Sequence, residues 1–172
     1  MANAFIEFKV LSTEQIPTLE RFVERLSAAK QSGEFPSDSE WEPYFAGQPL
    51  LYFENLSPEE MQEWQADWNA APVDQRHRDL SLWPHWDFGS FLDALKNGEF
   101  LVSGVMGDTA TFRLCFEPMA FPYGGSECLV AVVEAFGQQA VGVHDGAEYR
   151  QYFKQKRWQP KSRRKASDAP AL

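Results

Sequence analysis

The sequence is poor in cysteine and has no long hydrophobic run. Its 172 residues include two cysteines, Cys115 and Cys128, too few for the disulfide framework of a small secreted domain. The longest apolar run covers residues 129–135 and is interrupted by Glu134, so no segment approaches the ~20 apolar residues of a membrane-spanning helix. The N-terminus lacks the basic and apolar regions of a signal peptide. We therefore expect a soluble protein of the cytoplasm, without a membrane partner.

Histidine is also scarce, and the common motifs of metal chemistry are missing. The three histidines, His77, His85 and His144, form no His-Glu-x-x-His motif, and the two cysteines form no Cys-x-x-Cys pair. We therefore expect neither a metal site nor a cofactor. These absences leave an enzyme possible in principle but favour a protein without catalytic activity.

Basic residues are rare except near the C-terminus. Residues 1–153 carry 9 basic and 24 acidic side chains, a net charge of −15, whereas residues 154–172 carry 7 basic and 1 acidic, a net charge of +6. A chain that is acidic overall is not expected to bind duplex DNA. We interpret residues 1–158 as a single folded domain and residues 159–172 as a basic, disordered tail that could fold back on the acidic body.

The basic stretch Lys154–Lys165 allows a second interpretation. It contains Trp158, which could stack on a base, so the tail could serve as an arm for a nucleic acid. Seven positive charges without a folded reading domain give only weak, salt-sensitive binding. The nucleic-acid function is therefore an alternative rather than the favoured one.

Aromatic residues are abundant, and the chain alternates between strand and helix patterns. The 14 Phe, 6 Trp and 5 Tyr exclude a disordered chain. Alternation with a period of two predicts strands over residues 4–11, 99–106, 109–117 and 138–144, with a tight hairpin turn at Gly107-Asp108. Apolar stripes and capping residues predict helices over residues 17–32, 58–71, 88–97, 126–136 and 147–158.

The order of these elements predicts an α+β fold. Without residues 34–97 the first six elements follow βαββαβ, the order of a ferredoxin-like unit. Right-handed crossovers would place four strands in the order 4-1-3-2 in one antiparallel sheet, with two helices on one face. We therefore expect a four-stranded sheet with a helical, aromatic-rich insertion at residues 34–97, between the first helix and the second strand.

The predicted hairpin fixes which side chains share each face of the sheet. A two-residue turn pairs Met106 with Thr109, and one face of the sheet then packs on the helices. The other face is predicted to carry Phe5, Glu7, Lys9, Phe100, Val102, Met106, Thr111, Arg113, Cys115, Gly142 and His144. Because Phe100, Val102 and Met106 are too apolar to remain in solvent, we expect the insertion to cover this second face.

This second face also holds the candidate catalytic residues Glu7, Arg113, Cys115 and His144. Cys115 and His144 could act as nucleophile and base if the sheet brings them together. Nothing in the sequence marks an oxyanion hole, and a lone half-buried cysteine is usually inert. We therefore assign no catalytic role.

Two further segments are candidate binding sites. Gly125 and Ser126, at the start of a predicted helix, could hold an anion through free backbone N–H groups, although ordinary helix capping by Ser126 also explains them. The loop before residue 57 could bind a basic protein through its aromatic and acidic side chains, namely Trp41, Tyr44, Glu40 and Glu42.

The function favoured by the sequence is therefore that of a small, acidic, non-enzymatic protein that binds another macromolecule. A basic protein partner fits the charge, as for an inhibitor or an immunity-type module. The first alternative is a small enzyme or ligand-binding domain with a site between the sheet and the insertion. The second is a nucleic-acid accessory protein that uses Lys154–Lys165.

Overall fold

The computed structural model describes residues 4–120 and 126–164. The chain divides into two compact units. The first, called the sheet unit below, comprises Met1–Phe53 and Phe88–Phe153; the second, called the α3 unit, comprises Glu54–Asp87 and Lys154–Leu172. The insertion expected at residues 34–97 is thus divided between the two units.

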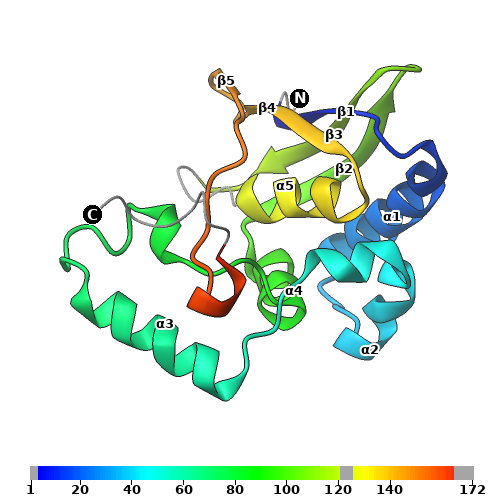
Figure 1. Ribbon diagram of the computed structural model, residues 1–172. Coiled ribbons are helices and arrows are strands. Elements are labelled where there is room, and N and C mark those ends of the chain that lie inside the picture. Colours follow the sequence, from blue (N-terminus) through cyan, green and yellow to red (C-terminus); the bar gives the residue numbers. More distant parts are fainter. Residues whose placement is uncertain (1–3, 121–125, 165–172) are drawn as a thin grey trace. The chain divides into compact units, whose positions relative to one another are not determined.

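The sheet unit contains a five-stranded antiparallel sheet in the strand order β2-β3-β1-β4-β5. The strands are β1 (Ala4–Lys9), β2 (Phe100–Gly107), β3 (Thr111–Pro118), β4 (Gln139–His144) and β5 (Tyr149–Gln151). The α-helices of this unit are α1 (Ile16–Ser32), α2 (Asp38–Trp41), α4 (Phe88–Asn97) and α5 (Ser126–Ala135). Helices α1 and α5 lie on the same side of the sheet (Figure 1). The expected α+β class is confirmed.

Helix α1 forms where the sequence predicts it. Pro17 lies in its first turn, where a missing N–H leaves no hydrogen bond unmade. Gly33 ends the helix with a φ of 75°, a left-handed conformation that glycine adopts without steric cost. The predicted apolar stripe is buried, as shown by Leu19, Phe22, Val23 and Leu26.

The sheet has five strands, so the expectation of four was wrong. The sequence predicts a helix over residues 147–158, but the chain turns back after β4, and β5 pairs with β4. The carboxylate of Asp145 accepts the N–H groups of Glu148 and Ala147, at 3.0 and 2.8 Å, and holds this turn. These hydrogen bonds lower the pKa of Asp145 and direct the chain into a hairpin.

The hairpin between β2 and β3 is present, but its predicted register is wrong. Met106 pairs with Arg113 rather than with Thr109, because the turn is wider than two residues. A bulge between Val102 and Gly104 shifts the register again. Phe100, Leu101, Val102, Val105 and Met106 are all apolar, so the sequence of β2 fits more than one register and does not reveal either irregularity.

Phe100 and Val102 change face as a result of the bulge. Both were predicted on the second face of the sheet, but each is 1% exposed and lies on the side of the helices. The Phe100 ring lies 6.4 Å from the ring of Phe116, and the ammonium group of Lys30 lies 4.5 Å from the Phe100 ring centroid. The two residues therefore belong to the core.

Aromatic residues of the expected insertion complete this core. Trp41 and Phe45 approach the ring of Phe22 in α1 at 5.2 and 4.9 Å, and Phe45 lies 4.9 Å from the ring of Phe136 after α5. Trp41 is 1% exposed and Phe45 is fully buried. This part of the insertion packs against the helices, which corrects the expectation that it would cover the second face of the sheet.

Gln138, directly before β4, connects two distant parts of the sheet unit. It is the one polar residue that is buried among those the structure describes, with 4% of its surface exposed. Its Oε1 accepts the N–H groups of Leu11 and Ser12, and its Nε2 donates to the carbonyl oxygens of Ser12 and Phe136. All four hydrogen-bonding positions of the amide are therefore used.

The α3 unit contains α3 (Pro58–Ala70) and a short 3₁₀ turn at Leu80–Leu82. The N–H of Glu60 donates to the Ser57 hydroxyl, and the N–H of Ser57 donates to the Glu60 carboxylate, at 3.2 and 2.9 Å. These two hydrogen bonds form a capping box, which satisfies two N–H groups at the start of the helix.

The C-terminal segment of the α3 unit differs from the expectation of a disordered tail from residue 159. Residues 159–164 lie beside α3 and include a 3₁₀ turn at Lys161–Arg163 (Figure 1). Residues 165–172, the rest of the expected tail, lie outside the described residues. For residues 161–164 the contacts with acidic residues of α3 agree with the other expectation, that the basic tail could fold back on acidic residues.

The substitution Gln138→Leu tests the connection made by the Gln138 amide. It leaves the N–H groups of Leu11 and Ser12 without partners, so we expect a loss of about 2–4 kcal/mol in the free energy of unfolding. The measurement is urea unfolding followed by circular dichroism, with Gln139→Leu at the exposed neighbouring position as the control. A loss below about 1 kcal/mol would show that the amide is not a structural link.

Candidate functional site

A cluster of polar and aromatic side chains lies on the second face of the sheet, around Glu7 of β1. The guanidinium group of Arg113 donates to Glu7 Oε2 at 3.3 Å, and the hydroxyl of Tyr149 donates to Glu7 Oε1 at 3.0 Å. Arg113 also lies over the ring of Phe5, 4.2 Å from its centroid, and the imidazole of His144 stacks on Phe5 at 5.3 Å. The predicted candidates Glu7, Arg113 and His144 therefore do share one face.

Tyr149 is a member of this cluster that the sequence analysis missed. Its aromatic spacing with Tyr152 and Phe153 resembles a helical stripe, whereas it lies in β5. Its ring crosses over Gly142, where a Cβ atom would lie only 2.0 Å from the Tyr149 hydroxyl. Burial and the hydrogen bond to Glu7 raise the pKa of Tyr149, so this phenol remains protonated.

The cluster is not covered in the way we expected. The side chain of Arg113 is 52% exposed and that of Glu7 is 20% exposed. Both oxygens of Glu7 nevertheless have partners within the cluster, and the positive charge of Arg113 lies beside the negative charge of Glu7. The polar groups therefore satisfy one another, as in a surface ion pair on a sheet.

The structure does not bring Cys115 and His144 together as a nucleophile and a base. Both pair with Phe5, but from opposite sides of β1, and strands lie about 4.8 Å apart, so the two backbones are separated by roughly 10 Å. The Nδ1 atom of His144 accepts the N–H of Gly146 at 3.1 Å. Burial raises the pKa of Cys115, against the smaller opposite effect of Arg113, so its thiol is not activated.

The candidate anion site cannot be assembled from the described residues. Gly125 lies outside them, and Ser126 is the first residue of α5, half-buried and followed by the acidic Glu127. Anion binding at Ser126 stays a prediction.

The four residues proposed to bind a partner are divided between core and surface. Trp41 is buried against Phe22 and Phe35 and has no surface to offer, and Tyr44 is half-buried. Glu40 and Glu42 are exposed. Aromatic residues in a loop can either anchor the loop or form its surface, and the sequence pattern does not distinguish the two roles.

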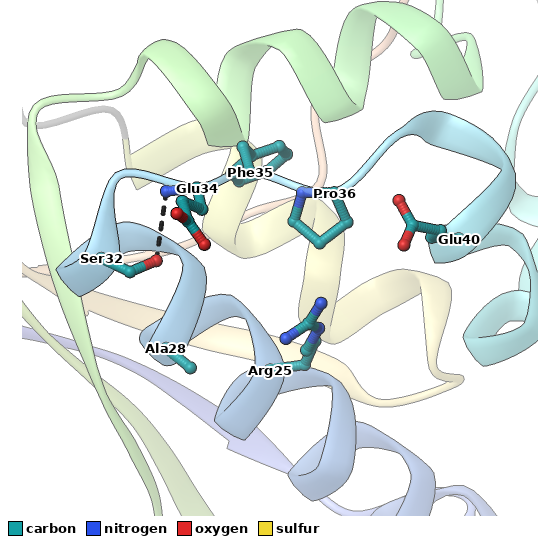
Figure 2. Close-up of a pocket in the computed structure, with 7 residues that line it drawn as sticks. All are labelled: Arg25, Ala28, Ser32, Glu34, Phe35, Pro36 and Glu40. Atoms are coloured by element: carbon teal, nitrogen blue, oxygen red, sulfur yellow. Dashed lines mark hydrogen bonds between the residues drawn. The ribbon is translucent and has the colours of Figure 1, made fainter.

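Glu40 also lines a hollow of about 430 Å³ between α1 and the segment that follows it. Figure 2 shows Arg25 rising from α1 toward Pro36 and Glu40, with Glu34 on the opposite side. The lining residues are Arg25, Ala28, Ser32, Glu34, Phe35, Pro36 and Glu40. Arg25 and Phe35 are lining residues that the sequence did not indicate. They lie on either side of Gly33 and come together only because the chain turns there.

Local hydrogen bonds hold the rim of this hollow. The Ser32 hydroxyl accepts the N–H of Glu34 at 3.1 Å, and the Glu40 carboxylate accepts the N–H of Ser37 at 2.8 Å. The hydrogen bonds from Ser37 lower the pKa of Glu40, and the charge of Arg25 adds a smaller effect in the same direction. Glu40 is therefore ionised at neutral pH.

The rim belongs to a segment with a strong negative charge. Residues 34–42 contain four acidic side chains and no basic one, namely Glu34, Asp38, Glu40 and Glu42. All four are exposed, and none forms an ion pair within the described part of the chain. Their negative charge is therefore directed to solvent.

Two other features, a metal-binding cluster and a membrane-spanning helix, are absent from residues 4–120 and 126–164. No group of three or more His, Cys, Asp or Glu residues there could hold a metal ion. No helix in that part of the chain is long and apolar enough to cross a membrane.

Comparisons of the chain with protein-family models, with curated proteins and with solved structures give no match.

The two thiols provide a test of the inert character of the sheet cluster. Burial raises the pKa of Cys115, so a smaller fraction is thiolate at pH 8 than in free cysteine, and iodoacetamide should modify it more slowly than glutathione. Burial raises the pKa of Cys128 to about 12, so this residue should stay unmodified in the folded protein. Mass spectrometry of the alkylated protein measures both rates, and Cys115→Ser serves as the control. Modification of Cys115 faster than that of glutathione would indicate an activated nucleophile.

Proposed function

We propose that this protein is a non-enzymatic binding module for a basic protein, and that residues 34–42 with the adjoining hollow are its docking site. The proposal rests on one observation above all: the four carboxylates of this segment have no ion-pair partner among the described residues, and two of them, Glu34 and Glu40, line a hollow with an apolar wall. Fixed charges of one sign at such a site favour encounter with a partner of opposite charge.

The distribution of charge between the units supports the proposal. The sequence of the α3 unit contains nine acidic and nine basic residues, so its charges balance. The sequence of the sheet unit contains 16 acidic and 7 basic residues, so the whole net charge of −9 belongs to it. The excess of acidic over basic residues therefore lies in the sequence of the sheet unit.

The shape of the hollow fits a lysine or arginine side chain of the partner. Its apolar wall, formed by Phe35 and Pro36, could pack on the aliphatic stem, while the charged head would reach Glu34 and Glu40. Arg25 reduces the net charge of the lining to −1. The interface must therefore extend beyond the hollow to Asp38 and Glu42 on the same segment.

We also infer that the first four strands form a ferredoxin-like core to which β5 is added at one edge, and that the protein acts in the cytoplasm. The order β4-β1-β3-β2 within the antiparallel sheet supports the first inference. Two free cysteines support the second, because disulfides are rare in reducing compartments.

Ligand binding at the Glu7 cluster is the second candidate function. It is supported by the exposure of Arg113 beside the aromatic ring of Phe5. It carries less weight because Arg113 and Tyr149 already donate to Glu7, and an anionic ligand would have to displace that carboxylate. Nucleic-acid binding through stacking on Trp158 is less favoured still, because that side chain is 6% exposed.

Neutralising the acidic segment tests the proposal. The partner is first isolated with the tagged full-length chain at low ionic strength, identified and purified, and its affinity is then measured by calorimetry. The triple variant Glu34→Gln/Asp38→Asn/Glu42→Gln spares the capping residue Glu40 and should weaken binding by about tenfold or more, since it removes three attractive charges.

A matched variant controls for the overall change in charge. Glu20→Gln/Asp93→Asn/Glu117→Gln removes three exposed carboxylates from elsewhere on the sheet unit and should weaken binding by less than about threefold. Equal losses in the two triple variants would mean that net charge rather than residues 34–42 determines binding. A partner with no basic surface would contradict the proposal itself.

A further inference from the structure

The α3 unit depends for its core on a segment that is distant in sequence. None of the side chains of residues 54–87 is buried. The buried side chains of this unit among the described residues are Trp158, at 6% exposed, and Pro160, and both belong to the C-terminal segment. Residues 54–87 thus pack around the C-terminal segment, which is distant from them in sequence, as a receptor packs around a peptide.

Trp158 is fixed by three contacts. Its backbone N–H donates to the carbonyl oxygen of Trp83 at 2.8 Å, and it forms a parallel bridge with Pro84. Its indole N–H donates to the carboxylate of Asp67 at 2.8 Å. A buried aromatic ring with its polar edge satisfied is the usual anchor of a bound peptide.

Charged contacts flank this anchor along one face of α3. The N–H of Lys161 donates to Glu63 at 2.8 Å, Arg163 donates to Glu60 at 2.9 Å, and Arg164 donates to Asp67 at 3.3 Å. The three acidic residues are spaced three and four positions apart, so they form one stripe of the helix. The stripe and the segment are complementary in charge.

We propose that residues 54–87 are a receptor for a basic, tryptophan-containing peptide segment, and that residues 154–164 of the same chain occupy this receptor as a strap. A partner segment of the same chemistry binds there once the strap is released. This goes beyond the docking site at residues 34–42 and does not depend on it.

The strap is held mainly by its anchor and its tether. The flanking ion pairs are partly exposed, and exposed pairs contribute little because water and salt screen them. A tethered segment, in contrast, is present at an effective concentration on the order of millimolar, so it excludes a free peptide in the intact chain. Replacing Trp158 weakens the binding of the strap and leaves the three acidic residues of the α3 stripe unchanged.

The test uses the full-length chain and a fluorescein-labelled peptide with the sequence of residues 154–164. Fluorescence anisotropy should show at least tenfold tighter binding of this peptide to the Trp158→Ala chain than to the unaltered chain. The same peptide carrying Trp158→Ala should bind the variant chain at least tenfold more weakly, since it has the charges but lacks the anchor.

A second variant keeps the proposal testable if Trp158→Ala loosens the α3 unit. Arg163→Gln/Arg164→Gln leaves the tryptophan and the tether in place and removes only the weak flanking pairs, so the peptide should bind this chain about threefold more tightly than the unaltered one. In the Trp158→Ala chain, hydrogen exchange of α3 should slow when the peptide is added. Failure of the peptide to bind either variant would overturn the proposal, as would equal binding by the peptide with and without its tryptophan.

Discussion

The α3 unit depends on one interaction, the burial of Trp158 between α3 and the backbone of Trp83. The same interaction determines which charged residues of this unit are paired. It places Arg163 and Arg164 against acidic residues of α3, so that the basic segment is engaged within its own unit. The carboxylates of residues 34–42 have no such partner among the described residues. The two acidic regions of this chain therefore differ in kind: one holds a segment of the chain, and the other faces solvent.

In the sheet unit the corresponding constraint is the central position of β1. Because β1 pairs with both β3 and β4, it brings Arg113 and His144, which are 31 positions apart, to either side of Phe5 and Glu7. The same arrangement keeps Cys115 away from His144, since a strand lies between them. The sheet thus brings the candidate site residues together, but their polar groups form hydrogen bonds and an ion pair with one another. For this reason the acidic segment, rather than this face of the sheet, is the favoured site.

The sequence predicts well what depends on local periodicity and capping, and it fails where distant contacts decide. The α+β class, the buried stripe of α1 and the capping box at Ser57 follow from spacing alone. The register of β2, the fifth strand and the burial of Trp41 do not, because a bulge, a turn at Asp145 and packing on Phe22 leave no periodic signal. Of the candidate site, the carboxylates of Glu40 and Glu42 could be predicted, but the hollow could not, since it forms only after the chain turns at Gly33.

Hydrogen–deuterium exchange of the complex with the purified basic partner tests the central claim most directly. The account predicts slower exchange of backbone amides in residues 34–42 and at the adjoining part of α1 when the partner is bound, with the exchange of α3 and of β1 unchanged. Protection confined to β1 and β3 would instead place the partner on the sheet face, and unchanged exchange over residues 34–42 would contradict the account.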